Sequence, residues 1–318
     1  MAVAMLMFVT FCVIIVLFVR NTIFICYYLS QLLRYRSGIG EKGIEFHNFE
    51  DYFQWQVSST EILLDTCYPS LNLCGKTVVD VGCGYGGRIP YMISNKGAKY
   101  IVATDIDPHA LEVAEACIKK HFIAEASVIE FRKSDDGGIP LEDRKIDVVI
   151  MIDIFEHLAE PERMLIECYR VLKDNGIVYF GTVGWYNYMA SHVTDYIPIP
   201  WCQVLFSDKV LIECIRRIQK SDSYISSIWD KNGNLRDRWE GISDLRDRPG
   251  EYINKLTIRD IRNICKNSPF EIQEFNVLGY RGRTCKWSRV LAPLAKIPLL
   301  NEFFHSYVSV ILCKSSIT

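Results

Sequence analysis

VVDVGCGYGG, residues 78–87, is the most informative part of this chain. It begins with the β-branched residues of a buried strand and ends in a turn with glycines at positions 82, 84, 86 and 87. Glycines directly after a strand let the backbone turn tightly and approach a ligand, because no Cβ stands in the way. The turn matches G-x-G-x-G, and through Gly87 it also matches the dinucleotide pattern G-x-G-x-x-G. The glycines alone therefore predict a bound ligand but leave its identity open.

Strand-like and helix-like segments alternate around this turn. The strand-like segments are TVVDV, YIVATDI, SVIEFRKSD, DVVIMID and IVYFGTV. Two clear helices lie among them: DPHALEVAEACIKKHF, with Asp107 as cap and Pro108 at its first position, and EPERMLIECYRVLK, which Asn175-Gly176 is expected to end. This alternation predicts an α/β domain with a parallel, doubly wound sheet and helices on both faces.

Acidic residues follow the strand-like segments at corresponding places. Asp80 precedes the first glycine by two residues, Asp105 ends the next strand, and the pair Asp135-Asp136 falls before the fourth strand. The carboxyl ends of parallel strands meet at one edge, where open α/β sheets bind ligands. Asp80 would repel a pyrophosphate but suits a cation, and Asp105 can accept both hydroxyls of a ribose. The pattern favours a ligand with an ammonium, a sulfonium, a ribose and an adenine, but no phosphate.

Four segments together resemble the successive motifs of class I S-adenosylmethionine-dependent methyltransferases with a type 11-like domain. The segments are VVDVGCGYGG, VATDIDPHAL, KSDDGGIPLEDRKIDVVI and IDIFEHLAEPERMLIECYRVLKDNGIVYF. The resemblance is close over Val78–Phe180 and looser from Ser59 to the C-terminus. It implies a mostly parallel, seven-stranded, Rossmann-like sheet that ends in a reversed hairpin formed by FEIQEFNV and YVSVILC.

The resemblance also implies S-adenosylmethionine as the cofactor. The residues that would hold it are Asp80, Gly82, Gly84, Gly86, Asp105, Ile106, Asp135 and Asp136. By resemblance, Asp80 and the glycines would hold the methionine portion, and Asp105 would bind the ribose hydroxyls. Ile106 and the Asp135-Asp136 pair would contact the adenine. The segment DDGGIP departs from the family, because it has two glycines where related proteins often carry larger residues.

Two further segments offer catalytic candidates. His192, in NYMASHVTDY, follows a strand end, where it could act as a base for an oxygen nucleophile or contact the substrate. Asp153, Glu156 and His157 have the spacing of one helical face, and could together bind a divalent cation. This second segment is similar to the E-x-x-E-H segment of ubiquinone-pathway O-methyltransferases, with an Asp in place of the first Glu. The alternative for it is a pocket floor without metal.

The N-terminal segment Met1–Val19 contains no charged residue. As a helix it would be roughly 28 Å long, close to the thickness of a bilayer core. It lacks the basic start and the small-residue cleavage site of a signal peptide, and it is too uniformly apolar for an ordinary core helix. It is therefore predicted to be a single-pass membrane anchor. Arg20 and later basic residues place the remainder in the cytoplasm, and Tyr27 and Tyr28 would suit the membrane interface.

These observations predict three regions. Residues 1–33 form the membrane anchor, residues 34–60 form a linker with a lead-in helix, and residues 61–318 form the methyltransferase domain. Within that domain the strand–helix alternation lapses after Gly184, and residues 185–252 are predicted to be an inserted substrate lid of helices and loops.

Composition excludes several functions. The 318 residues carry a net charge of −2, which gives no reason to expect a nucleic-acid partner, and the 12 cysteines include no C-x-x-C pair.

The leading hypothesis is O-methylation of a hydrophobic, lipid-like or secondary-metabolite acceptor at the membrane. One alternative is a non-catalytic binding or scaffold protein on the same fold. Another is a nicotinamide-dependent oxidoreductase, which Asp80 disfavours.

Overall fold

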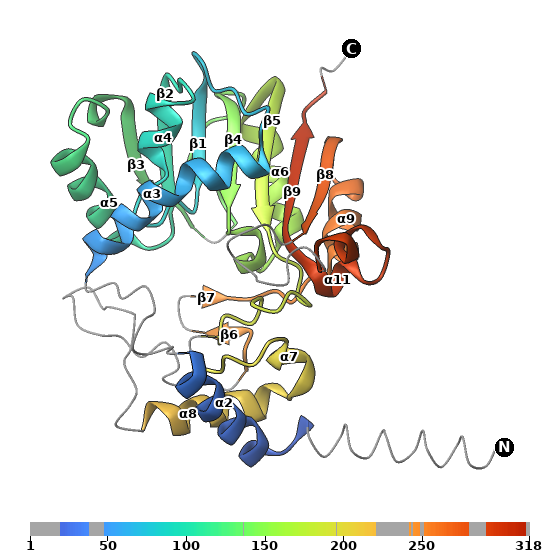
Figure 1. Cartoon of the computed structure of the whole chain (residues 1–318). Coiled ribbons are helices and arrows are strands. Elements are labelled where there is room, and N and C mark those ends of the chain that lie inside the picture. The colour runs from blue at the N-terminus through green and yellow to red at the C-terminus, as the bar shows by residue number, and fades with distance from the viewer. Residues whose placement is uncertain are drawn as a thin grey trace. The chain divides into compact units, whose positions relative to one another are not determined.

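The computed structural model describes residues 20–37, 48–135, 137–194, 196–220, 242, 244–248, 251–279 and 291–315 (Figure 1). The chain divides into two compact units. The sheet unit comprises, among these residues, 48–135, 137–184, 254–279 and 291–315. The small unit comprises 20–37, 185–194, 196–220, 242, 244–248 and 251–253.

The sheet unit is built on a seven-stranded sheet with the order β3-β2-β1-β4-β5-β9-β8. The strands are β1 (Thr77–Val81), β2 (Tyr100–Asp105), β3 (Ile129–Lys133), β4 (Ile146–Ile152), β5 (Leu172–Thr182), β8 (Glu271–Gly279) and β9 (His305–Cys313). The pairings from β3 to β5 are parallel, whereas β9 runs antiparallel to both β5 and β8. The predicted mostly parallel sheet with a reversed hairpin at its end is confirmed. The order changes direction between β1 and β4, where such sheets bind ligands at their carboxyl ends.

Helices cover both faces of this sheet (Figure 1). They are α3 (Phe49–Cys67), α4 (Ile89–Ser94), α5 (Pro108–His121), α6 (Pro161–Val171), α9 (Ile258–Asn267) and α11 (Asn301–Phe304), with short 3₁₀ turns η1 (Ala126–Val128), η2 (Phe155–His157) and η3 (Ala292–Lys296). Alternate residues of a strand face opposite sides. Val79 therefore packs in one core with α6 and α9, and Val78 packs in the other with α3 and α4.

The helix that follows β2 begins where its sequence predicts. The side chain of Asp107 accepts a hydrogen bond from the His109 amide at 2.9 Å, and Pro108 occupies the first turn of α5. This arrangement satisfies an amide that would otherwise have no partner within the helix. It fixes the start of α5 three residues after Asp105, at the carboxyl edge of the sheet.

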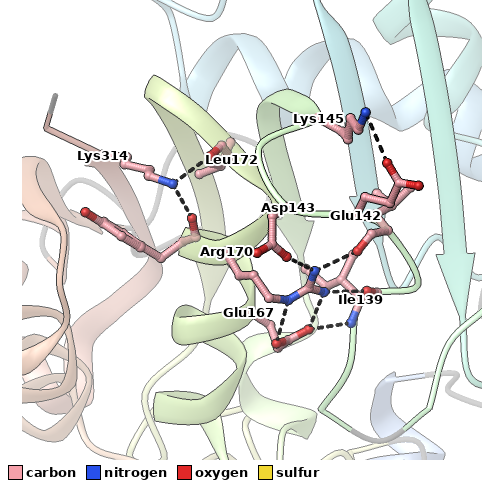
Figure 2. A network of polar contacts seen from close by, with 10 residues as sticks. Ile139, Glu142, Asp143, Lys145, Glu167, Arg170, Leu172 and Lys314 are labelled. Carbon is pink, nitrogen blue, oxygen red and sulfur yellow. Dashed lines mark hydrogen bonds and ion pairs between the residues drawn. The ribbon is translucent and has the colours of Figure 1, made fainter. Parts of the chain in front are cut away.

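The end of α6 is held by a network of polar contacts (Figure 2). Arg170 donates to both carboxylate oxygens of Glu167, at 3.0 and 2.8 Å, and to Asp143 at 2.8 Å. The same guanidinium donates to the carbonyl oxygens of Ile139 and Leu141, so it ties the loop before β4 to the helix. These carboxylates raise the pKa of Arg170.

Lys314, just after β9, joins the last strand to the same helix end. Its ammonium is almost fully buried and donates to the carbonyl oxygens of Tyr169 and Leu172, at 2.7 Å each (Figure 2). These are the carbonyls that the last turn of a helix leaves without intrahelical donors. Burial lowers the pKa of Lys314, and the contacts stabilise its charged form.

His305, the first residue of β9, is fully buried between two backbone groups. The Gly184 amide donates to its Nε2 at 2.9 Å, so Nδ1 carries the proton and donates to the Asn301 carbonyl at 2.8 Å. A proton on Nε2 would break the first bond and place a charge in a buried position. Burial accordingly lowers the pKa of His305 from 6.5 to about 4.

Acid is therefore expected to destabilise the fold through His305. A group with a lowered folded-state pKa contributes stability above its unfolded pKa, and that contribution is lost as the pH falls from 6.5 towards 4. Between pH 7 and pH 5 the loss is about 2 kcal/mol of unfolding free energy. Urea unfolding of the wild type and of His305→Asn at both pH values measures it. The difference in unfolding free energy between the two proteins is expected to shrink on acidification. A difference that stays constant would contradict the lowered pKa of His305.

The small unit contains α2 (Ile23–Ser37), α7 (Cys202–Leu205), α8 (Asp208–Gln219) and the short strands β6 (Asp247–Arg248) and β7 (Glu251–Tyr252). Its core brings Cys26 of α2 against α8, together with Val193, Ile197 and Phe206. The described residues within 185–252, the predicted lid, thus fold with a segment from the N-terminal region. Their action as a lid stays a prediction.

The predicted membrane-spanning segment, Met1–Val19, lies outside the described residues. Among the residues that the structure does describe, no helix has the length and apolar character needed to cross a membrane. Residues 23–33, which the predicted anchor included, are part of α2 and pack within the small unit.

Candidate functional site

The glycine turn leaves β1 at the carboxyl edge of the sheet. Gly82, Gly84 and Gly86 have φ angles of 70°, 53° and 76°, in the left-handed region that favours glycine. The amides of Gly82 and Cys83 both donate to the carbonyl oxygen of Thr104 on β2, at 2.8 and 2.9 Å. The turn is thus fixed to the neighbouring strand.

The surroundings of the four glycines show which of them are required by packing and which leaves room for a ligand. A Cβ on Gly82 would collide with the side chain of Ile154, and one on Gly86 would lie 3.0 Å from the Cβ of Ala114. A Cβ on Gly87 would lie 2.6 Å from the Phe53 carbonyl oxygen of α3. Gly84 alone of the four has no atom within 4 Å of that position. Gly87 is therefore explained by the close approach of α3, and Gly84 leaves room for a ligand.

Asp80 lies on β1 beside this turn and is 3% exposed. Burial raises its pKa from 3.8 to about 7, the Arg88 guanidinium opposes that shift, and Asp105 adds to it. A carboxylate held so far from water is stabilised by a nearby cation. Asp80 is thus suited to a positively charged group.

Asp105 ends β2 and is held by two backbone amides. Its Oδ2 accepts from the Gly84 amide at 2.8 Å, and its Oδ1 accepts from the Asp107 amide at 2.9 Å. Burial raises the pKa of Asp105, and these two hydrogen bonds oppose the shift. Each carboxylate oxygen can accept further hydrogen bonds. The structure therefore brings Asp80, Asp105 and the glycine turn together, as predicted.

The predicted adenine contacts lie at the ends of β2 and β3. Ile106 is 55% exposed, and the Ser134 amide donates to the Asp105 carbonyl at 2.9 Å, which brings these strand ends together. Asp135 follows directly and is exposed, whereas Asp136 lies outside the described residues. A Cβ on Gly138 would collide with the Asp135 carboxylate. The two glycines of DDGGIP are therefore compatible with an Asp135 side chain folded against its own loop.

Asp153 has partners that the sequence did not indicate. Arg88 of the loop before α4 forms an ion pair with its Oδ2 at 2.7 Å, and the Tyr307 hydroxyl of β9 donates to its Oδ1 at 2.8 Å. Burial and the Asp153 charge raise the pKa of Tyr307. Arg88 is the one charged residue between positions 81 and 95, which is a signal that could have been noticed. Tyr307 lies too far along the chain for a local pattern to reveal it.

The alternative metal site at Asp153, Glu156 and His157 does not fit this geometry. The segment is not an α-helix, because Asp153 has a φ of 59° and a 3₁₀ turn follows it. The buried Glu156 accepts a hydrogen bond from the Thr182 hydroxyl at 2.7 Å. Within the described part of the chain, no group of three potential ligand atoms within 4.8 Å of one another includes Asp153.

His192 belongs to the small unit and has a φ of 52°. The Asp80–Asp105 site belongs to the sheet unit. A role for His192 as a catalytic base stays a prediction.

The region that contains this site matches a known protein family. Residues 79–180 match the model of a family described as a methyltransferase domain. An O-methyltransferase of ubiquinone biosynthesis from Neisseria meningitidis is 30% identical over 112 residues, which is 35% of this chain and 46% of that protein. The corresponding protein of Nitrosomonas europaea is 33% identical, again over 35% of this chain and 45% of its own length. The chain thus spans just under half the length of these relatives.

One solved structure supports the fold. It is a chain from the complex between the Haloferax volcanii Trm112 methyltransferase activator and a protein assigned as a methyltransferase. The TM-score is 0.50 and the sequence identity 14%, with 84% of this chain and 98% of that chain covered. The domain match supports the predictions of an enzyme and of S-adenosylmethionine as its cofactor.

Proposed function

We propose that this protein is an S-adenosylmethionine-dependent O-methyltransferase whose acceptor is a hydrophobic or lipid-like hydroxyl compound. The observation that carries the proposal is a pair of acids at neighbouring strand ends, Asp80 buried and Asp105 half-buried. Asp80 and Asp105 flank a glycine turn in which Gly84 has open space beside it. A cation and a ribose on one small molecule match these two acids.

S-Adenosylmethionine supplies an activated methyl group on a sulfonium. In the proposed reaction the acceptor oxygen forms a bond to that methyl carbon, the carbon–sulfur bond breaks, and the hydroxyl proton leaves to a base. Asp80 would stabilise the cationic end of the cofactor, and Asp105 would fix the ribose. The main contribution of the chain is orientation and exclusion of water.

Oxygen as the methylated atom is supported by the names of the two relatives, which are O-methyltransferases of ubiquinone biosynthesis. An apolar acceptor is supported by the uncharged Met1–Val19 segment, which remains a predicted membrane anchor. Placement of the catalytic domain at the cytoplasmic face of a membrane is part of this proposal.

Cofactor selection is the first test. S-Adenosylmethionine and its demethylated product are each expected to raise the thermal unfolding temperature of the full chain, and NAD is not. A shift with NAD, or none with any of the three, would contradict the cofactor assignment. Transfer of labelled methyl groups into a membrane extract, followed by solvent partition, then tests the acceptor class. Label confined to the aqueous fraction would exclude a lipid-like acceptor, and cofactor binding with no transfer would favour a scaffold protein.

Cofactor affinity is expected to rise with pH because of Asp80. Because the pKa of Asp80 is raised to about 7, its buried carboxyl is half protonated near pH 7. The bound proton stabilises the folded state at lower pH. A cationic ligand needs the carboxylate, so binding strengthens about tenfold between pH 6 and pH 8. Calorimetric titration at several pH values measures this change. Asp80→Asn serves as the control, because it removes the Asp80 titration while leaving that of the ligand; an equal pH dependence in both proteins would contradict the role.

A further inference from the structure

Helix α2 of the small unit has one face packed in the core and an apolar face that is exposed. Cys26 and Ser30 are fully buried, and the Ser30 hydroxyl lies 4.0 Å from the Cys214 sulfur of α8. Phe24, Tyr28 and Leu32 are 62%, 66% and 47% exposed. These three residues recur at every fourth position and form one stripe, opposite the buried pair.

A helix on the surface of a water-soluble unit normally buries its bulky apolar face. Helix α2 does pack bulky residues, among them Ile23, Tyr27 and Leu33, against the core of the small unit, but the stripe on its other face stays exposed. The rings of Phe24 and Tyr28 stack with centroids 6.4 Å apart, which makes this apolar surface continuous. Exposed contiguous apolar surface of this kind marks a site of contact with a membrane or another protein.

The sequence around α2 favours a membrane as the occupant. The uncharged Met1–Val19 segment ends at Arg20, three positions before α2 begins. The first 40 residues contain three arginines and no acidic residue, which complements an anionic surface. Arg217 of α8 places its guanidinium 5.5 Å from the Phe24 ring centroid, at the edge of the stripe. A basic helix with aromatic and leucine side chains on one face is typical of helices that lie in the bilayer interface.

We propose that α2 lies in the headgroup–acyl boundary of an anionic lipid bilayer, with Phe24, Tyr28 and Leu32 facing the acyl chains. This contact belongs to the small unit and does not depend on methyl transfer. It also differs from a membrane-spanning anchor, since α2 remains packed on α8 while its opposite face contacts lipid.

Photocrosslinking in the full chain tests the proposal. Tyr28 is replaced by the photoreactive amino acid p-benzoylphenylalanine, and the protein is mixed with vesicles of phosphatidylcholine and phosphatidylserine. The matched control carries the same group in place of Ile123, which is 80% exposed and belongs to the sheet unit. Lipid adducts are expected at position 28 at least about tenfold above those at position 123. The yield at position 28 is expected to fall severalfold with pure phosphatidylcholine.

The adduct identifies the occupant in each outcome. Crosslinks from position 28 to Met1–Val19 or to a second copy of the chain would overturn the proposal, because one of these would then cover the stripe. Equal lipid labelling at both positions, or none at position 28, would also overturn it. Unchanged thermal unfolding of the two substituted proteins shows that α2 is still folded.

Discussion

Asp105→Ala is expected to weaken S-adenosylmethionine binding about 100-fold or more. In the proposed binding mode Asp105 accepts both ribose hydroxyls, and a hydrogen bond to a charged group contributes about 1.5–3 kcal/mol. Loss of two such bonds exceeds the roughly 2.7 kcal/mol that corresponds to a hundredfold change in affinity. Isothermal titration of the full chain with the cofactor measures the effect.

The side chain of Asp105 also accepts the Gly84 and Asp107 amides, so its removal has a structural cost. Asp105→Asn retains the size of the side chain and one oxygen acceptor, and is expected to lose affinity while unfolding closer to the wild-type temperature. Glu115→Ala, on the exposed face of α5, is the matched control because its carboxylate forms an exposed ion pair with Lys119 one helical turn away. Wild-type affinity in both Asp105 variants would refute the ribose assignment.

Gly82→Ala is expected to lower the free energy of unfolding by about 3 kcal/mol or more. A left-handed φ of 70° costs a residue with a side chain roughly 1–2 kcal/mol. The added Cβ would also collide with Ile154, and overpacking in a core costs about 1–3 kcal/mol. Urea unfolding monitored by circular dichroism gives the change.

Gly84 and Gly75 provide a matched pair for this test. Both have positive φ angles, 53° and 69°, and neither has an atom within 4 Å of an added Cβ. Each alanine variant is expected to lose only about 1–2 kcal/mol, from backbone strain alone. Only Gly84→Ala is expected to weaken the cofactor, because only Gly84 lies beside Asp105. Equal cofactor affinity in the two variants would show that the space at Gly84 is not used by the ligand.

The parts of the site that the sequence predicted lie within one strand–turn–helix unit or at the ends of neighbouring strands. Parallel pairing brings Asp80 and Asp105 to the same edge, so their positions after successive strands were sufficient. Gly87 was ambiguous for a different reason. Its role depends on α3, which precedes the turn in sequence and packs across it, and spacing alone contains no information about that contact.

The boundary between α6 and β5 shows how tertiary pairing overrides local signals. The segment through Lys173 has helix-forming residues, and Asn175-Gly176 looked like the stop. The helix ends at Val171 instead, and β5 begins at Leu172. Lys314 explains the difference, because its backbone exchanges hydrogen bonds with this region at 2.9 Å and its ammonium holds the Leu172 carbonyl. Lys314 lies 142 residues after Leu172 in the sequence, so no local pattern contains this information.

The contacts of Asp153 join residues that are synthesised at different times. Arg88 and Asp153 emerge from the ribosome early, whereas Tyr307 follows Asp153 by 154 residues. Until β9 is synthesised and inserted between β5 and β8, one oxygen of the Asp153 carboxylate has no hydroxyl to bind. The set of contacts that joins Arg88, Asp153 and Tyr307 is therefore complete only after the last strand has formed. A nascent chain that already contains every glycine and every acid of the turn is still structurally immature at this position.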